Sequence, residues 1–481
     1  MPDSEKPRRR LRLLDATMII MGSMIGSGIF LAPGLIASIA IESRLGAGSF
    51  VFVWIIGGLL TVCAALSFGE LAAAFPRTGG QYVYLSQSLA PFWGFLYGWT
   101  LFTVIQCGFI AAVAVAFANY LGVFLAAVSQ SNVVFSVAAF RVSAVQVAAI
   151  LLILIITWIN SRGLKAGAMV QNVLGIAKIS ALLGLVVFGL GSGKGSWTHF
   201  QPLLPETVAV GTVGAFAVAM SKALFAYDSW NVVTFVAEET HDPVKTLPRA
   251  LLLGTLGVTL IYTLACVAYL YVLPVELAAK VPDQRIAAEV AQIVMGPIGL
   301  GLIALAVLIS AAGCDNGLIL SGPWLYYAMA KDRLFFRGAA RLNSETATPL
   351  RSLQYQAIWS CVLVLSGSFG TRGAQLYSDL LTFTAFASLL FNVLTIIGLF
   401  RLRKRRPDLP RPYKVAGYPF VPLLYLLVAL FFLIFIAIGD PRNSGFGMLT
   451  ILAGLPLYLY WRWKERRETG TVTPAKLTSS L

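Results

Sequence analysis

Long apolar stretches alternate along the chain with short segments that hold most of the charged residues. Each stretch has about 20 residues or more, the length that a helix rising 1.5 Å per residue needs to cross roughly 30 Å of hydrocarbon. We therefore predict an all-α membrane protein with twelve transmembrane helices and no soluble domain. The predicted spans cover residues 14–40, 49–75, 91–126, 142–160, 168–191, 209–237, 248–273, 290–330, 353–369, 376–400, 418–438 and 445–462.

The composition supports a membrane protein. The 481 residues are 58% hydrophobic and only 12% charged, whereas a soluble domain has about 25% charged residues because water must wet its surface. All five cysteines lie inside apolar stretches, which argues against a disulfide framework or a zinc site. No phosphate-binding Gly-x-x-x-x-Gly-Lys-Ser/Thr loop is present, so the chain does not drive transport by hydrolysing ATP itself. We predict no enzyme activity, no cofactor and no metal.

The formal net charge of +15 reflects membrane orientation and not a nucleic-acid partner. Lys and Arg gather in the short segments between spans, and they are far more frequent on one side if the N-terminus is cytoplasmic. No basic stripe interleaves with aromatic residues, as nucleic-acid binding would require. We expect contact with membrane lipid and both termini in the cytoplasm. The absence of any Asn-x-Ser/Thr sequon points to a plasma membrane of the bacterial inner-membrane type.

The first span contains the run Gly22-Ser-Met-Ile-Gly-Ser-Gly-Ile-Phe30. A break in a membrane helix frees amides and carbonyls that need new partners, and glycines lower the cost of such a break. The freed amides would begin the second half-helix, where the helix dipole favours an anion such as a carboxylate. The alternative is close helix packing, because Gly22 and Gly26 also fit the small-xxx-small pattern.

The sixth span is interrupted by the polar run from Tyr227 to Asn231. It places Asp228 near the bilayer midplane, where an aspartate costs roughly 2.5–3.5 kcal/mol on insertion scales. Asp228 either adds a charge to a binding site or caps the second half-helix. Carbonyls freed in this span would suit an ammonium group. Paired interruptions in matching spans point to a transporter's binding site, and the two breaks together suit a zwitterion.

Lys178 lies about halfway along the fifth span, some ten residues from its nearest end. That distance, roughly 15 Å of helix, is too long for a snorkelling side chain. We expect its ammonium to bind carbonyls of the first span, together with Ser310 or Cys314 of the eighth span. Such contacts would take the place of a sodium ion and predict sodium-independent transport. The alternative is that Lys178 carries a proton.

These motifs make the chain resemble the amino acid–polyamine–organocation superfamily, and within it the L-type amino acid transporter branch with its bacterial relatives. The resemblance covers most of the chain, and the motifs occur in order at the expected spans. Those that carry it are Gly22–Phe30, Arg77-Thr-Gly-Gly-Gln-Tyr-Val-Tyr84, Phe117-Ala-Asn-Tyr120, Phe225-Ala-Tyr-Asp-Ser-Trp-Asn231, Glu238-Glu239 with Pro243 and Leu247-Pro-Arg-Ala250, and Asn316-Gly317.

The resemblance implies a single transporter domain over residues 1–481 with the LeuT-type fold. Two inverted repeats of five spans, about 14–191 and 209–400, would be followed by the appended spans 418–438 and 445–462. In such a fold Phe225 would be an aromatic gate, Trp230 and Asn231 would shape the pocket, and Lys178 would replace a sodium ion. The residues that we predict around the substrate, from the resemblance and, for Asp228, from its place in the interrupted sixth span, are Ile25, Gly26, Ser27, Gly28, Phe225, Ala226, Tyr227, Asp228, Trp230 and Asn231.

Two departures from the branch limit what carries over. The loop from Ala127 to Arg141 lacks the cysteine with which mammalian members bond a heavy chain, so we expect no disulfide-linked partner. Asp228 stands where mammalian members tend to have glycine, which narrows the pocket and favours small or medium neutral substrates. We predict a sodium-independent exchanger of neutral amino acids that works by alternating access. The alternatives are a proton-coupled symporter, a transporter of cationic amino acids or polyamines, and a sensor that binds amino acids without transporting them.

Overall fold

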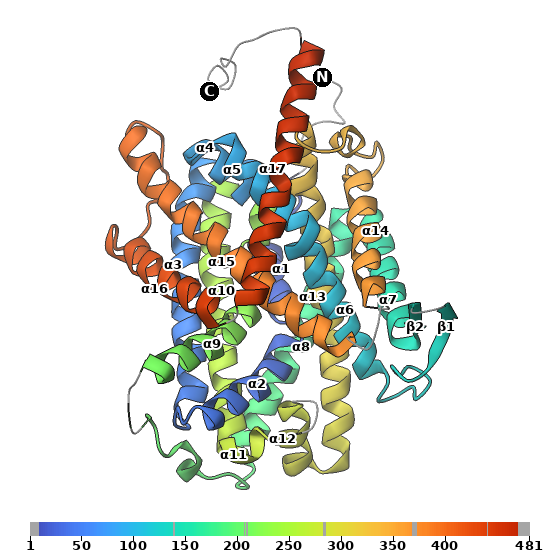
Figure 1. Cartoon of the computed structure of the whole chain (residues 1–481), viewed down its shortest axis with the longest axis vertical. Helices are drawn as coiled ribbons and strands as arrows, with labels where there is room; N and C mark the ends of the chain where they lie inside the picture. The colour runs from blue at the N-terminus through green and yellow to red at the C-terminus, as the bar shows by residue number, and fades with distance from the viewer. Residues whose placement is uncertain are drawn as a thin grey trace.

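The computed structural model describes residues 9–137, 140–205, 207, 210–281, 285–367, 373–439 and 441–469, and these form a bundle of long helices (Figure 1). The predicted limits at residues 209 and 369 lie outside the described residues. In the first half of the chain the helices are α1 (Leu13–Met24), α2 (Gly28–Glu42), α3 (Ser49–Ala74), α4 (Gln81–Ser88), α5 (Pro91–Thr100), the π-helical η2 (Leu101–Ile105), α6 (Gln106–Leu121), α7 (Ala144–Ser161), α8 (Leu164–Gly191) and the short 3₁₀ helix η3 (Trp197–Phe200).

The second half of the chain is also helical. Its helices are α9 (Val210–Ala226), the 3₁₀ segment η4 (Val232–Glu239), α10 (Pro243–Val272), α11 (Val275–Ala278), α12 (Ile286–Met295), α13 (Pro297–Lys331), the 3₁₀ turn η6 (Arg337–Ala340), α14 (Leu350–Ser366), α15 (Gly373–Arg405), α16 (Phe420–Gly439) and α17 (Pro441–Thr469). Among the described residues, ten helical stretches are long and apolar enough to cross a membrane. The prediction of a multi-span helical membrane protein is confirmed.

Two predicted features differ from the structure. The predicted span 290–330 is two helices, because Gly296 adopts a positive φ of 69° and Pro297 then starts α13. The predicted loop after the third span contains a small antiparallel hairpin of β1 (Val133–Val137) and β2 (Phe140–Ser143). Valine and phenylalanine favour strands, and this segment is largely exposed outside the bundle. The other predicted spans match helices with shifts of a few residues at their ends.

The first and sixth spans are discontinuous. α1 ends at Met24 and α2 begins at Gly28, while α9 ends at Ala226 and η4 begins at Val232. α1 packs against α8, α10 and α13, α2 packs against α9, and α3 runs along α10. α1 is therefore enclosed by other helices, and its break lies inside the bundle. α2, α11 and α12 occupy one end of the bundle and α4 the opposite end (Figure 1).

The outer helices present apolar stripes to their surroundings. On α7 the exposed residues Leu151, Leu154, Ile155 and Trp158 are spaced three and four apart, so they share one face. A soluble protein does not leave such a continuous apolar face on a long helix, whereas a bilayer solvates it. The buried polar residues instead gather on the inner helices, where other helices supply their partners.

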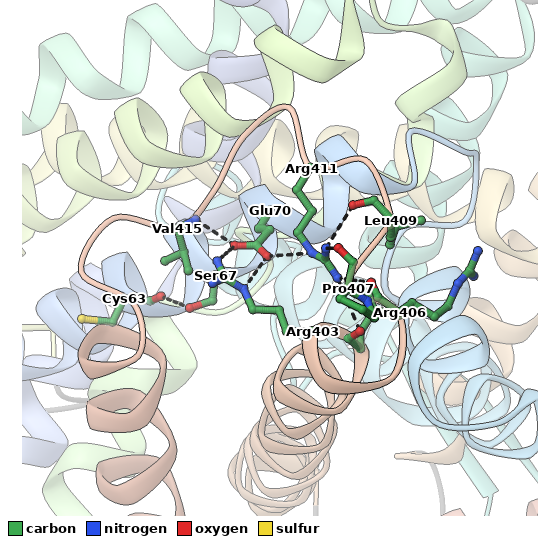
Figure 2. A network of polar contacts seen from close by, with 10 residues as sticks. Cys63, Ser67, Glu70, Arg403, Arg406, Pro407, Leu409, Arg411 and Val415 are labelled. Carbon is green, nitrogen blue, oxygen red and sulfur yellow. Dashed lines mark hydrogen bonds and ion pairs between the residues drawn. The ribbon is translucent and has the colours of Figure 1, made fainter.

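An ion-pair cluster ties α3 to the segment between α15 and α16 (Figure 2). Glu70 on α3 is only 1% exposed. Its carboxylate accepts hydrogen bonds from both Arg403 on α15, with an Nε–Oε1 distance of 2.8 Å, and the backbone N–H of Val415, also at 2.8 Å. Arg411 lies 3.5 Å away through Nε and also donates to carbonyls of its own loop, such as that of Arg406. We name this cluster the Glu70 clasp.

Candidate functional site at the two broken helices

The breaks in the first and sixth spans lie against each other. A Cβ atom added to Gly28, the first residue of α2, would lie 2.8 Å from the Cβ of Ala226, the last residue of α9. Only glycine permits this approach, because real Cβ atoms do not come so close without displacing backbone. A Cβ atom added to Gly26 would lie 3.0 Å from the Sγ of Cys314 on α13. Gly28 is therefore required by its contact with the sixth span, and Gly26 packs closely on the eighth.

The N-terminal end of α2 and the C-terminal end of α9 provide opposite polarities at this junction. The amides of Gly28 and Ile29, which begin α2, donate to no backbone carbonyl among the described residues, whereas the carbonyls of Ala223 and Phe225 near the end of α9 accept from the N–H groups of Tyr227 and Asp228. The helix dipole makes the start of α2 partly positive and the end of α9 partly negative. A zwitterion with a carboxylate and an ammonium group matches this pair of ends.

Tyr262 of α10 joins both breaks, and sequence reasoning missed it. Its hydroxyl donates to the carbonyl oxygen of Met24 at 2.8 Å and lies 3.2 Å from that of Ala226. Tyr227 packs its ring against Tyr262 and donates its hydroxyl to the carbonyl of Trp54 on α3, at 2.9 Å. In the sequence, Tyr262 stands out only by its hydroxyl group in the middle of an apolar span. Many tyrosines of membrane proteins share that feature.

Lys178 of α8 is buried and directed at the first break. Its ammonium donates to the carbonyls of Gly22 and Ile25, both at 2.7 Å, and to that of Ser310 at 3.1 Å. These three acceptors use all three hydrogens of the ammonium group. Carbonyls released where α1 ends are thus bound by a fixed positive charge.

Ser310 and Cys314 of α13 lie on the same side of this break. The Ser310 hydroxyl is 3.0 Å from the carbonyl of Ile25 and 3.1 Å from that of Gly26, and the Cys314 thiol donates to the carbonyl of Ser23 at 3.0 Å. Together with Lys178, they bind the carbonyls of Gly22, Ser23, Ile25 and Gly26. The structure therefore brings these three predicted residues together around the end of α1.

Phe225 stacks on Phe109 of α6, with ring centroids 4.6 Å apart and planes inclined by 13°. Sequence reasoning did not single out Phe109, because an isolated aromatic residue in an apolar span looks like ordinary packing. The stack places aromatic rings from two spans next to the junction of α2 and α9. An aromatic gate requires such a ring beside the junction.

Asp228 faces away from the first break. Its carboxylate accepts a hydrogen bond from Ser388 of α15 at 2.9 Å, and η4 is preceded by Asn231 without a side-chain cap. Asp228 lines a cavity of about 30 Å³, together with residues of α3, α15 and α16 that include Thr61 and Tyr425.

Trp230 and Asn231 also point toward other helices. The Trp230 ring packs edge to face on Phe68 of α3, with centroids 4.7 Å apart. The Asn231 amide donates to the Gln81 side chain at 2.6 Å, and Gln81 in turn donates to Asn392 of α15 at 3.1 Å. Gln81 belongs to a sequence motif that the resemblance highlights, but no role followed for it from the sequence.

The comparisons with known proteins agree with this architecture. A family model described as amino acid permease matches residues 11–455. The serine/threonine exchanger SteT of Bacillus subtilis is 30% identical over 453 residues, which cover 94% of this chain and 96% of that protein. The human large neutral amino acids transporter small subunit 2 is 29% identical, covering 95% of this chain and 82% of its own length. The human Asc-type amino acid transporter 1 is 28% identical, covering 95% and 84% respectively. The chain therefore belongs to the amino acid permease family, whose members are membrane transporters and not enzymes.

Proposed function

We propose that this protein exchanges neutral L-amino acids across a membrane, independently of sodium, by alternating access. The observation that carries the proposal is the junction of α2 and α9, where a helix start and a helix end meet around Gly28 and Ala226. The start of α2 suits the carboxylate of an amino acid, and the carbonyl end of α9 suits its ammonium group. Ile25, Gly26 and Ser27 complete the turn on the carboxylate side.

Sodium independence is supported by the contacts of Lys178. A sodium ion would satisfy loose carbonyls with its charge, and here an ammonium group already donates to those of Gly22 and Ile25 at 2.7 Å. The hydroxyl of Ser310 and the thiol of Cys314 bind the neighbouring carbonyls. The end of α1 is thus satisfied without a metal ion.

A neutral substrate is favoured over a cationic one by the surroundings of Asp228. Its carboxylate accepts a hydrogen bond from Ser388 and lines a cavity with residues of α3, α15 and α16, so it does not offer a free counter-charge for a lysine or arginine side chain at the junction of α2 and α9. The names of the relatives agree with this choice, because one is a serine/threonine exchanger and another transports large neutral amino acids. We propose small or medium neutral amino acids as substrates.

The remaining proposals concern architecture and setting. We propose a single transporter domain of the LeuT type, with inverted repeats over about 14–191 and 209–400 followed by spans 418–438 and 445–462. Support comes from the two discontinuous spans, which are the first of each proposed repeat. The Lys and Arg distribution supports cytoplasmic termini in a bacterial inner membrane. We also propose that no disulfide-linked partner is needed, since residues 122–143 contain no cysteine.

The test is uptake of radiolabelled serine and leucine by liposomes that contain the purified protein. We expect uptake only when the vesicles hold internal amino acid, and no effect of a sodium gradient. Lys178→Ala should abolish uptake, whereas Lys165→Ala, which removes an exposed lysine of the same helix, should not. Equal uptake by empty vesicles would exclude obligate exchange, and a sodium requirement would exclude the role proposed for Lys178. Specific amino-acid binding without any uptake would identify a sensor instead.

A further inference from the structure

Asp315 of α13 is a second ionisable residue in the middle of the bundle, one position after Cys314. It is fully buried, and neither of its carboxylate oxygens has a hydrogen-bond partner among the described residues. Its neighbour Asn316, by contrast, donates to Gln171 at 2.8 Å and accepts from Asn160 at 2.9 Å. An ionised carboxylate without donors costs far more to bury than a neutral one. The described contacts therefore hold Asn316 in place but leave the Asp315 oxygens available for a proton.

Lys178 is the charge that acts on Asp315. The two side chains interact electrostatically but form no ion pair, and the Lys178 stem runs past Gly313, where an added Cβ would lie 3.0 Å from Nζ. Cys314 is the other titratable group that interacts with Asp315. The other charged side chains on elements packed against α13 lie within four residues of an element's end, and they are Asp15, Lys165, Glu238, Glu239, Glu289, Arg337 and Arg351.

The contacts of Lys178 determine which of the two groups can exchange a proton. All three ammonium hydrogens are bound to carbonyls, two of them in the first span, so loss of a proton would leave a nitrogen lone pair facing a carbonyl oxygen. Lys178 is thus held as an ammonium ion in this arrangement. Asp315 has no such restraint, so a proton can bind to it or leave it without breaking a described hydrogen bond.

We propose that Asp315 is a proton-binding site whose occupancy is coupled to movement of the first span. This proposal rests on the exchange function proposed above and adds a proton to its cycle. When α1 moves away, Lys178 loses the carbonyls of Gly22 and Ile25, and its charge then stabilises an ionised Asp315 more strongly than in the described arrangement. When α1 returns, those carbonyls bind the ammonium again, and the neutral form of Asp315 is favoured.

The chemical step is a simple protonation. One Asp315 carboxylate oxygen takes a proton from water that reaches the first break on one side of the membrane, forming an O–H bond. The same bond breaks when the opposite side opens, and the proton returns to water there. No other group changes its bonds, and no oxidant or reductant takes part. The protein then moves one proton with each coupled movement of α1.

The experiment measures proton movement and amino-acid exchange in the same liposomes. The vesicles carry a trapped pH-sensitive dye and internal serine, and radiolabelled serine is added outside at a series of external pH values. We expect the lumenal pH to change only while the wild-type protein exchanges serine, and the rate of exchange to vary with the external pH. Asp315→Asn should retain serine exchange but lose both the dye signal and the pH dependence. Glu345→Gln, in an exposed loop, should behave as the wild type in both readouts.

The two readouts separate failure of this proposal from failure of the proposed function. No serine exchange by the wild type would overturn the exchange function itself. Exchange by the wild type without any proton signal, or an unchanged signal in Asp315→Asn, would overturn the role of Asp315. If Asp315→Asn does not fold, Asp315→Leu takes its place, because it removes the buried polar atoms altogether. That variant must also exchange serine without moving protons.

Discussion

The Glu70 clasp gives a quantitative prediction about stability. Glu70→Gln keeps the size of the side chain but removes its charge, and it replaces one acceptor oxygen with an N–H₂ group. That group would face the donors of Arg403 or the N–H of Val415, which now bind the carboxylate. Arg403 and Arg411 would lose their shared counter-charge while they remain largely buried.

The expected loss follows from the burial of the cluster. Removing one partner of a buried ion pair costs about 3–5 kcal/mol, because the other charge stays buried and unpaired. The lower part of that range applies, since the Arg403 guanidinium retains its stacking on Tyr418, 3.6 Å from the ring centroid, and is itself 21% exposed. We therefore expect Glu70→Gln to lower the free energy of unfolding by about 3–4 kcal/mol.

The measurement is equilibrium unfolding in mixed detergent micelles, with Asp242→Asn as the matched control. Asp242 forms an ion pair with Lys245 at 3.2 Å, and the two side chains are 42% and 70% exposed. The same carboxylate-to-amide change there should cost less than about 1 kcal/mol, because water screens the pair. If the two variants lose the same free energy of unfolding, burial does not strengthen the ion pairs of the Glu70 clasp.

Three further predictions concern the site and its surroundings. Tyr262→Phe removes the hydroxyl that contacts the carbonyls of Met24 and Ala226, so serine exchange in liposomes should slow while folding is retained; an unchanged rate would make that contact dispensable. Gly28→Ala forces a methyl group to 2.8 Å from the Cβ of Ala226, so exchange should fall sharply, and normal exchange would show that the junction can open to admit it. Burial is the main cause of the raised pKa of the Asp332 carboxyl, which directly follows α13. The contribution of this carboxyl to stability is therefore complete at pH values below about 4, and it is lost as the pH rises through the folded-state pKa. Asp332→Asn should therefore show a weaker dependence of unfolding on pH between about pH 4 and the folded-state pKa of Asp332, which thermal unfolding at several pH values will measure; an unchanged dependence in that range would contradict the assignment.

Local patterns in the sequence were sufficient to place most helices. Continuous apolar stretches have few alternatives to a helix in hydrocarbon, because each backbone amide must find a partner within its own segment. The same rule explains why the glycines at 26 and 28 and the polar run at 227–231 marked two interruptions. Patterns of this kind did not separate α12 from α13, because the division depends on the backbone conformation of the single residue Gly296.

The partners of the buried polar groups were decided by the tertiary structure. The sequence showed that Lys178 and Asp228 needed partners, since isolated charges are expensive in an apolar interior. It did not show that Tyr262 would touch both breaks, that Asp228 would meet Ser388, or that Glu70 would bind a loop more than 300 residues away. Such contacts depend on how helices rotate and pack against one another, and residue spacing within one span carries no information about that. The need for a partner is therefore local chemistry, whereas its identity is a property of the assembled bundle.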